Sequence, residues 1–250
     1  MDRTRLLHEL GLGPVWKLRQ RAAAMPNAGE TVIERGDGPS VPPLPACSLE
    51  PGLAVAPAGS VATMDWPTLE AAVAACRQCR LFAARKQAVL GVGDRQADWL
   101  FVGEGPGAEE DEKGEPFVGQ AGKLLDNMLA AIGLRRGENV YIANAVKCRP
   151  PQNRTPEAEE IAACRPYLAR QIELIQPRLI VALGRPAAQS LLQVEVKIAA
   201  ARGRLHQYQS IPLIVTYHPA YLLRNLADKA KAWEDLCFMT QTMKNLQDPS

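Results

Sequence analysis

Short apolar runs alternate with amphipathic segments along most of this chain. Four runs have the length and continuity of buried strands, at residues 99–102, 140–143, 179–183 and 211–216. Apolar residues that recur three and four positions apart predict helices over residues 120–132, 155–175, 186–192 and 226–246. Because strand and helix alternate, we expect an α/β fold, a three-layer α/β/α sandwich with a central, mainly parallel four-stranded sheet.

Single residues locate several helix boundaries. Asp65 indicates a helix start, and Gly133 is expected to end the helix over residues 120–132. Thr155 is the expected N-cap of the helix that follows it, because Pro156 would then occupy the first helical position.

The first 62 residues have a different composition from the rest. Residues 3–20 predict a short amphipathic helix, whereas residues 25–57 are rich in Pro, Ala, Gly and Ser. Such a segment buries too little apolar area to offset the entropy of ordering, so we expect a flexible linker. We therefore divide the chain into an N-terminal extension, residues 1–62, which is a candidate site for a protein partner, and an ordered domain, residues 63–250.

The overall charge excludes few partners, but the placement of charge is more informative. The chain has 250 residues, of which 47% are hydrophobic, and 29 Lys and Arg against 27 Asp and Glu. Acidic residues concentrate between 104 and 115, and a basic stretch with Lys147, Arg149 and Arg154 follows, which fits a polyanion-binding face. No apolar run approaches about 18 residues and no signal peptide is evident, so we expect a cytoplasmic protein with no membrane contact.

Polar and glycine residues follow three of the predicted strands. Gly103-Glu104-Gly105, Asn144 and Tyr217-His218 all stand at strand ends. Ligands of open parallel sheets bind beyond the carboxyl ends of the strands, so we expect one composite site there. The glycine-rich turn lacks the Lys-Ser/Thr of a phosphate-binding loop and is flanked by carboxylates, which argues against a phosphate ligand.

Four of the six cysteines have the spacing of a metal centre. Cys76 and Cys79 form a Cys-x-x-Cys pair, and Cys148 and Cys164 lie far along the chain. Four thiolates suit either a structural zinc ion or a [4Fe–4S] cluster, and the spacing alone does not decide between them.

Four motifs, together with the cysteine pattern, resemble the family 4 uracil-DNA glycosylases, which carry an iron–sulfur cluster. The motifs are Gly103-Glu104-Gly105-Pro106-Gly107, Gly114-x-Pro116-Phe117-Val118-Gly119-x-Ala121-Gly122, Asn144-x-x-Lys147-Cys148-Arg149-Pro150-Pro151 and His218-Pro219-Ala220-Tyr221-Leu222-Leu223-Arg224. The resemblance covers residues 76 to about 245. It departs at Ala220, where related glycosylases often have Ser.

The resemblance implies a monofunctional DNA-repair enzyme that cleaves the N-glycosidic bond of deoxyuridine in single- or double-stranded DNA, and we expect a monomer. It implies that a [4Fe–4S] cluster is held by Cys76, Cys79, Cys148 and Cys164. No dissociable cofactor is expected. Uracil inside a duplex is inaccessible, so the base has to leave the stack before the reaction.

Binding roles for the extruded base follow from the same resemblance. Phe117 is the expected stacking surface, and the Asn144 amide is expected to bind uracil N3–H and O4. The main chains of Gly103 and Gly105 would add contacts. His218 is expected to donate a hydrogen bond to the anion that develops at O2.

The remaining roles concern water and DNA. Glu104 and Glu110 are the candidates for orienting the attacking water, and Glu110 alternatively excludes a thymine methyl group. The expected DNA contacts are a wedge by Leu222 and Leu223, a phosphate contact by Arg224, and a path lined by Lys147, Arg149 and Arg154.

Three other functions are considered. A non-catalytic uracil- or damaged-DNA-binding module would use the same pocket. A covalent-trapping relative of the same superfamily requires an insertion rich in Lys, Arg and His after Asn144, which this sequence lacks. An iron–sulfur electron carrier has no use for a base-reading pocket.

Overall fold

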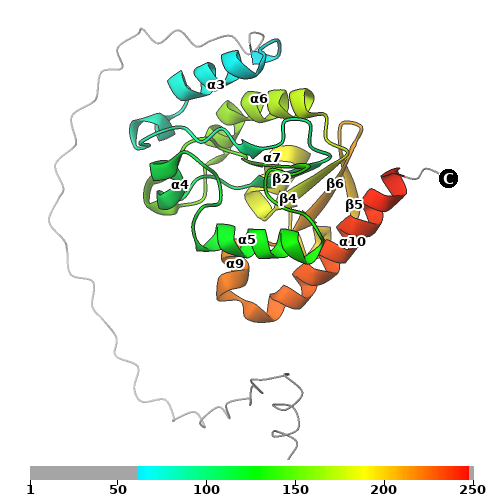
Figure 1. The fold of residues 1–250 in the computed structure, drawn as a ribbon. Helices are drawn as coiled ribbons and strands as arrows, with labels where there is room; N and C mark the ends of the chain where they lie inside the picture. The colour runs from blue at the N-terminus through cyan, green and yellow to red at the C-terminus, as the bar shows by residue number, and fades with distance from the viewer. Residues whose placement is uncertain (1–60, 248–250) are drawn as a thin grey trace, which may run out of the picture. The chain divides into compact units, whose positions relative to one another are not determined.

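In the computed structural model, residues 61–247 are described, and they form an α/β unit around one sheet (Figure 1). The sheet has six strands in the order β1-β3-β2-β4-β6-β5. The four central strands run parallel: β3 (Val140–Asn144), β2 (Trp99–Gly103), β4 (Leu179–Leu183) and β6 (Ile211–Thr216). Both the expected helix over 3–20 and the expected linker over 25–57 lie outside the described residues.

The predicted α/β fold and its parallel core are confirmed, but the predicted number of four strands is wrong. Two short strands pair antiparallel at the edges, β1 (Val92–Gly93) with β3 and β5 (Leu205–Tyr208) with β6. Neither has a continuous apolar run, since β1 has two residues and β5 reads Leu-His-Gln-Tyr. Apolar runs therefore predict only the buried strands.

Helices cover both faces of the sheet. α5 (Gln120–Ala131), α9 (Pro219–Arg224) and α10 (Lys229–Gln247) pack on one face, and α6 (Ala158–Ile175) and α7 (Arg185–Leu192) on the other. Side chains of β2 alternate between the faces, with Trp99 and Phe101 toward α5 and α10, and Leu100 and Val102 toward α6 and α7. Because both faces are covered, every residue of this strand is buried, which explains its uninterrupted apolar sequence.

The remaining elements lie beside these layers. α3 (Trp66–Ala75) packs against α6 in a third apolar cluster, which also contains Cys148 and Cys164. The short helices are η1 (Arg80–Ala83), α4 (Ala108–Lys113), η2 (Pro151–Asn153), α8 (Ile198–Ala201) and η3 (Leu226–Asp228). Within residues 61–247, no helix combines the length and apolar character needed to cross a membrane.

The start of α6 differs from the prediction. Glu157, and not Thr155, is the N-cap, because the Glu160 carboxylate accepts a hydrogen bond from the Glu157 N–H at 2.8 Å in a capping box. Thr155 is thereby left outside the helix, where its side chain hydrogen-bonds to Glu104.

Candidate active site and cysteine cavity

A cleft of about 780 Å³ opens at the carboxyl edge of the parallel strands. All four central strands contribute to its wall: Glu104 follows β2, Asn144 ends β3, Gly184 and Arg185 follow β4, and His218 follows β6. Gly105, Glu110, Phe117, Arg154 and Arg224 also line it. The residues that the sequence places at separate strand ends thus lie in one cavity.

Phe117 and His218 both line this cleft, and their rings pack against each other. Their ring centroids are 5.5 Å apart and the rings are inclined by 30°. Phe117 has a φ of 57°, which is costly for a large side chain, so its main chain has to be held. Arg136 does so by donating to the Pro116 carbonyl at 2.9 Å and the Phe117 carbonyl at 2.8 Å.

Gly103 provides space for the two neighbouring site residues. A Cβ atom on Gly103 would lie 2.5 Å from the Phe117 ring and 2.5 Å from Asn144 Oδ1. Only glycine permits so close an approach. Gly103 therefore lies behind the cleft, against the two residues expected to bind the base.

Asn144 carries a buried acceptor without a partner. The residue is 2% exposed, and no donor within the described residues reaches its Oδ1 atom. An unpaired buried acceptor costs about 1–3 kcal/mol. Oδ1 is therefore ready to accept a hydrogen bond from an N–H group of a ligand.

His218 is fixed as a neutral donor. It is the N-cap of α9, and its Nδ1 accepts a hydrogen bond from the Ala220 N–H at 3.1 Å. Burial lowers the pKa of His218 to about 4, with a further lowering by Arg224 and an opposing effect of Glu110. With Nδ1 accepting and the ring neutral, the proton resides on Nε2, which can donate to a ligand.

The two candidate carboxylates differ in their surroundings. Burial raises the pKa of Glu104, and the Thr155 side chain and Arg185 oppose this rise. Glu110 instead accepts three main-chain hydrogen bonds, from Gly107 at 3.0 Å, Val118 at 3.0 Å and Gly119 at 3.1 Å. Glu110 thereby joins the glycine-rich turn to the loop that carries Phe117.

Sequence reasoning did not include Thr155 and Arg185 in the site. Arg185 follows Gly184 at the end of β4, so the strand-end rule applied to the third predicted strand would have found it. Nothing in the sequence connects Thr155 with Glu104, because their contact depends on the tertiary fold.

Two of the predicted DNA contacts are wrong. Lys147 is 1% exposed, and its ammonium group donates to the Asn144 carbonyl at 2.8 Å and to Gln171 Oε1. Leu222 is 1% exposed and belongs to the core beneath α9. Neither side chain can reach a DNA strand from these positions.

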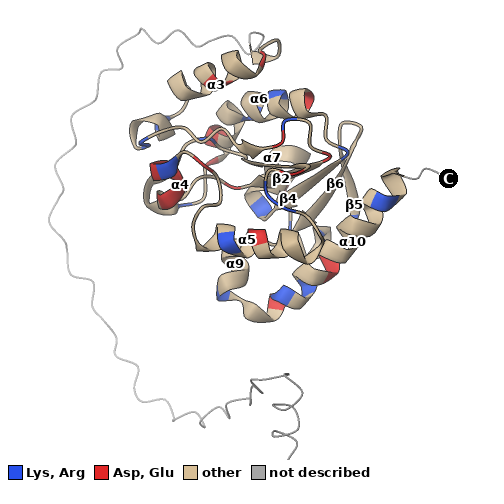
Figure 2. Cartoon of the chain, in the orientation of Figure 1, with Lys and Arg blue, Asp and Glu red and all other residues tan. Residues whose placement is uncertain are grey.

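The other predicted DNA contacts stay at the surface. Leu223 is 41% exposed beside the buried Leu222, and Arg224 lines the cleft. Arg154 also lines the cleft, but its guanidinium forms two hydrogen bonds to Glu160, at 2.8 and 2.6 Å. Arg149 donates to Asn153 Oδ1 at 2.8 Å. Arg224 lies in the last turn of α9, whereas acidic residues dominate α4, where Figure 2 shows them in red.

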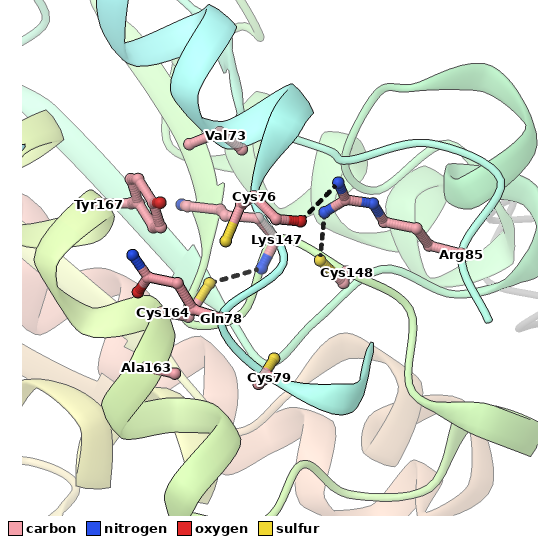
Figure 3. Close-up of a pocket in the computed structure, with 10 residues that line it drawn as sticks. All are labelled: Val73, Cys76, Gln78, Cys79, Arg85, Lys147, Cys148, Ala163, Cys164 and Tyr167. Atoms are coloured by element: carbon pink, nitrogen blue, oxygen red, sulfur yellow. Dashed lines mark hydrogen bonds between the residues drawn. The ribbon is translucent and has the colours of Figure 1, made fainter. Parts of the chain in front are cut away.

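The four predicted cysteine ligands surround one small cavity (Figure 3). Cys76 directly follows α3, Cys79 precedes η1, Cys148 follows β3, and Cys164 lies in α6. The fold thus gathers side chains that are up to 88 positions apart in the sequence, from Cys76 to Cys164.

Two of the four sulfur atoms accept hydrogen bonds. Arg85 donates to Cys148 Sγ at 2.8 Å and to the Cys76 carbonyl at 3.0 Å, so it joins two of the ligand segments. The Lys147 N–H donates to Cys164 Sγ at 3.2 Å. Burial raises the pKa of the Cys164 thiol to about 12.

This donor set fits a bound iron–sulfur group. Hydrogen bonds to sulfur stabilise thiolates, and metal coordination offsets the burial that otherwise keeps the thiols protonated. Among residues 61–247, no three Cys, His, Asp or Glu side chains are grouped as ligands of a single metal ion.

Comparisons with known proteins concern the same part of the chain. A family model described as the uracil DNA glycosylase superfamily matches residues 90–237, which include the cleft residues but begin after Cys76 and Cys79. A type-4 uracil-DNA glycosylase of Pyrobaculum aerophilum is 43% identical over 197 residues, covering 75% of this chain and 100% of that protein. Type-4 uracil-DNA glycosylases of Archaeoglobus fulgidus and Thermotoga maritima are 49% and 48% identical, covering 60% and 62% of this chain and 79% and 82% of their own lengths.

Proposed function

The chain belongs to the uracil-DNA glycosylase superfamily, and from this premise we propose that it removes uracil from DNA by hydrolysing the N-glycosidic bond of deoxyuridine. The products are free uracil and an abasic site. The observation that carries this proposal is the convergence of Phe117, the unpaired Asn144 Oδ1 and the neutral His218 in one cleft.

The cleft binds an extruded base on its face and on its edge. Uracil lies on the Phe117 ring, and its N3–H donates to Asn144 Oδ1 while the Asn144 amide N–H donates to O4. Cytosine has an acceptor at N3 and a donor at position 4, so it would leave Oδ1 unpaired and oppose the amide donor. A mismatch of this kind costs about 1–3 kcal/mol for each buried group.

Bond cleavage separates charge between the base and the sugar. Negative charge develops on the departing uracil, and the His218 Nε2–H donates to O2 as this charge grows. A neutral imidazole suffices for this, which agrees with the pKa of about 4. Because the ring is already oriented by Ala220, little rearrangement accompanies the reaction.

The sugar side of the reaction needs a water molecule and a negative group. Glu104 lines the cleft, and Thr155 and Arg185 favour its ionised form against the effect of burial. We assign to Glu104 the orientation of the attacking water and the stabilisation of the cationic sugar. Glu110 positions the Phe117 loop, as its three main-chain hydrogen bonds support.

We further propose that Cys76, Cys79, Cys148 and Cys164 hold a [4Fe–4S] cluster. Their shared cavity and the donors aimed at their sulfur atoms support this assignment. The bound cluster would cross-link the segment after α3 to the loop after β3 and to α6. Iron and acid-labile sulfide in a ratio near one, with little zinc, would support the cluster, and one zinc per chain would overturn it.

The remaining proposals concern the setting of the reaction. We propose that the protein acts as a monomer on single- or double-stranded DNA in the cytoplasm, where thiols stay reduced. We also propose that residues 63–250 form the catalytic domain and that residues 1–62 are an extension available to a protein partner.

The direct test is incubation with a labelled oligonucleotide that contains one deoxyuridine, followed by alkali. Strand cleavage at the uracil, with release of free uracil, is the expected result. A matched oligonucleotide with thymidine at the same position should stay intact. Selective binding of the uracil oligonucleotide without release of the base would overturn the enzymatic proposal in favour of a non-catalytic binding module.

A further inference from the structure

Lys147 is buried between the base-reading residue and the cysteine cavity, and it contacts both. Its side-chain Nζ donates to the Asn144 carbonyl at 2.8 Å. Its main-chain N–H donates to Cys164 Sγ at 3.2 Å. One residue therefore joins the end of β3 to α6 through two separate donors, of which Figure 3 shows the one to Cys164.

The Asn144 carbonyl is bound by a side chain and not by the main chain of its own segment. The segment after β3 runs on beside β2, since the Ala145 and Val146 N–H groups donate to the Gly103 and Glu104 carbonyls. The Lys147 N–H donates to the Cys164 sulfur, and the Asn144 carbonyl accepts from the lysine ammonium. The lysine ammonium thus holds the Asn144 main chain in addition to its pairing with Gly103 in the β2–β3 ladder.

The ammonium group is itself held in place. It donates to Gln171 Oε1, and the Gln171 amide donates to the Leu90 carbonyl at 3.0 Å and to the Tyr141 hydroxyl at 3.2 Å. Gln171 is fully buried. Burial of an ammonium group is costly unless it is well hydrogen-bonded, so an apolar side chain would fill this volume at lower cost. What an apolar side chain could not do is bind the Asn144 carbonyl.

We propose that Lys147 is a positioning residue for uracil recognition, which keeps Asn144 Oδ1 directed at the base by holding the Asn144 main chain. The proposal rests on the function proposed above and adds a residue that never touches the substrate. Without the lysine, the end of β3 shifts. A uracil that stacks on the Phe117 ring can then no longer hydrogen-bond to the Asn144 amide. A misplacement of about 1 Å at a reacting site can reduce a rate by about 10²-fold.

The test is a Lys147→Met variant, which keeps the side-chain volume and removes the ammonium group that donates to Asn144 and Gln171. We expect kcat/KM for uracil excision to fall by about 10- to 100-fold. We also expect loss of preference for an oligonucleotide containing 2′-fluoro-deoxyuridine, a poorly cleaved uracil analogue, over the same oligonucleotide containing thymidine. Lys113→Met, which removes an exposed lysine on α4, is the matched control and should change neither quantity.

A double-mutant cycle separates positioning from general damage. In an Asn144→Ala background the amide is already absent, so Lys147→Met should cause little further loss of excision or of binding preference. An equal loss in both backgrounds, or an unchanged binding preference in Lys147→Met, would overturn the proposal.

A second variant decides the matter if Lys147→Met misfolds or loses iron. Gln171→Leu keeps the lysine but removes its support, so we expect a smaller loss of uracil preference that also disappears in the Asn144→Ala background. Wild-type levels of preference in Gln171→Leu would then overturn the proposal. Failure of the wild-type protein to release uracil would instead count against the proposed function, whatever the variants do.

Discussion

The cleft and the cysteine cavity differ in whether their buried acceptor atoms have hydrogen-bond partners in the protein. In the cleft, Asn144 Oδ1 is buried and has no partner among the described residues. In the cavity, Cys148 and Cys164 accept hydrogen bonds from Arg85 and Lys147. A ligand that comes and goes needs open hydrogen-bonding positions, whereas a group that stays bound can have its surroundings completed by the protein.

The two regions also differ in the elements that build them. The cleft is formed by the carboxyl ends of parallel strands, where side chains project beyond the sheet. The cavity is formed beside the sheet by α3, α6 and the loop after β3. Within the described residues, the segment from Asn144 to Cys148 contributes to both regions. Variants in the cavity should therefore lower mainly the stability of the protein, whereas variants in the cleft should lower mainly the rate of uracil excision.

The largest expected effect is on the cavity side. Cys164→Ala should remove the absorbance near about 400 nm that is typical of such clusters and lower the melting temperature by about 10 °C or more, because three segments lose their common anchor. Absorbance, iron content and thermal unfolding would be measured. Cys237→Ala is the control, since Cys237 is exposed on α10. A Cys164→Ala protein with normal iron content and stability would exclude this residue as a ligand.

On the cleft side, His218→Ala should reduce the single-turnover excision rate by about 10²- to 10³-fold, with iron content unchanged. The loss is expected because the donor to uracil O2 disappears. Single-turnover kinetics on a deoxyuridine oligonucleotide would measure it.

The same residue gives a pH test in the wild-type protein. Because the pKa of His218 lies near 4, its proton on Nε2 and its neutral ring persist throughout the neutral range. The contribution of His218 should therefore stay constant between about pH 8 and pH 5. A rate controlled by a histidine titrating near pH 6.5, and absent from His218→Ala, would contradict the assigned protonation state.

The smallest expected effects distinguish the buried Leu222 from its exposed neighbour Leu223. Leu222→Ala should lower the free energy of unfolding by about 2–4 kcal/mol, since a buried side chain is removed from the core. Leu223→Ala should leave stability unchanged and reduce excision from duplex DNA more than from single-stranded DNA, because a wedge is needed only where a stack has to be opened. Denaturant unfolding and parallel assays on both substrates would measure these effects. Similar stability losses in the two variants would remove the distinction.

The sequence predicts the parallel core well because buried strands are continuous apolar runs. Trp99–Gly103 and Val140–Asn144 extend the predicted strands by one residue each, and Leu179–Leu183 matches its prediction. The edge strand β1 was not predicted, because it has only two residues and its pairing depends on β3 and not on its own composition. The expectation that Thr155 caps α6 failed for a similar reason, since local propensity does not include the capping box of Glu157 and Glu160.

For the site, too, the sequence fails to predict those features that depend on tertiary contacts. Strand ends bring Glu104, Asn144 and His218 together, so their shared cleft follows from topology. Lys147 was assigned to the surface because lysines rarely lie in a core, and its buried partners Asn144 and Gln171 come from different elements. Leu222 and Leu223 are neighbours in a six-residue helix, too short for periodicity to show which one faces the core.

The loop that carries Phe117 has a consequence for the end of each catalytic cycle. Arg136 and Glu110 hold this loop from its carbonyl and N–H sides, so the slot for the base is formed by the protein alone. A slot shaped in advance offers the detached base the same stacking and edge contacts as the base still joined to DNA. Free uracil should consequently occupy the slot in competition with the next nucleotide, and its departure then contributes to the pace of turnover.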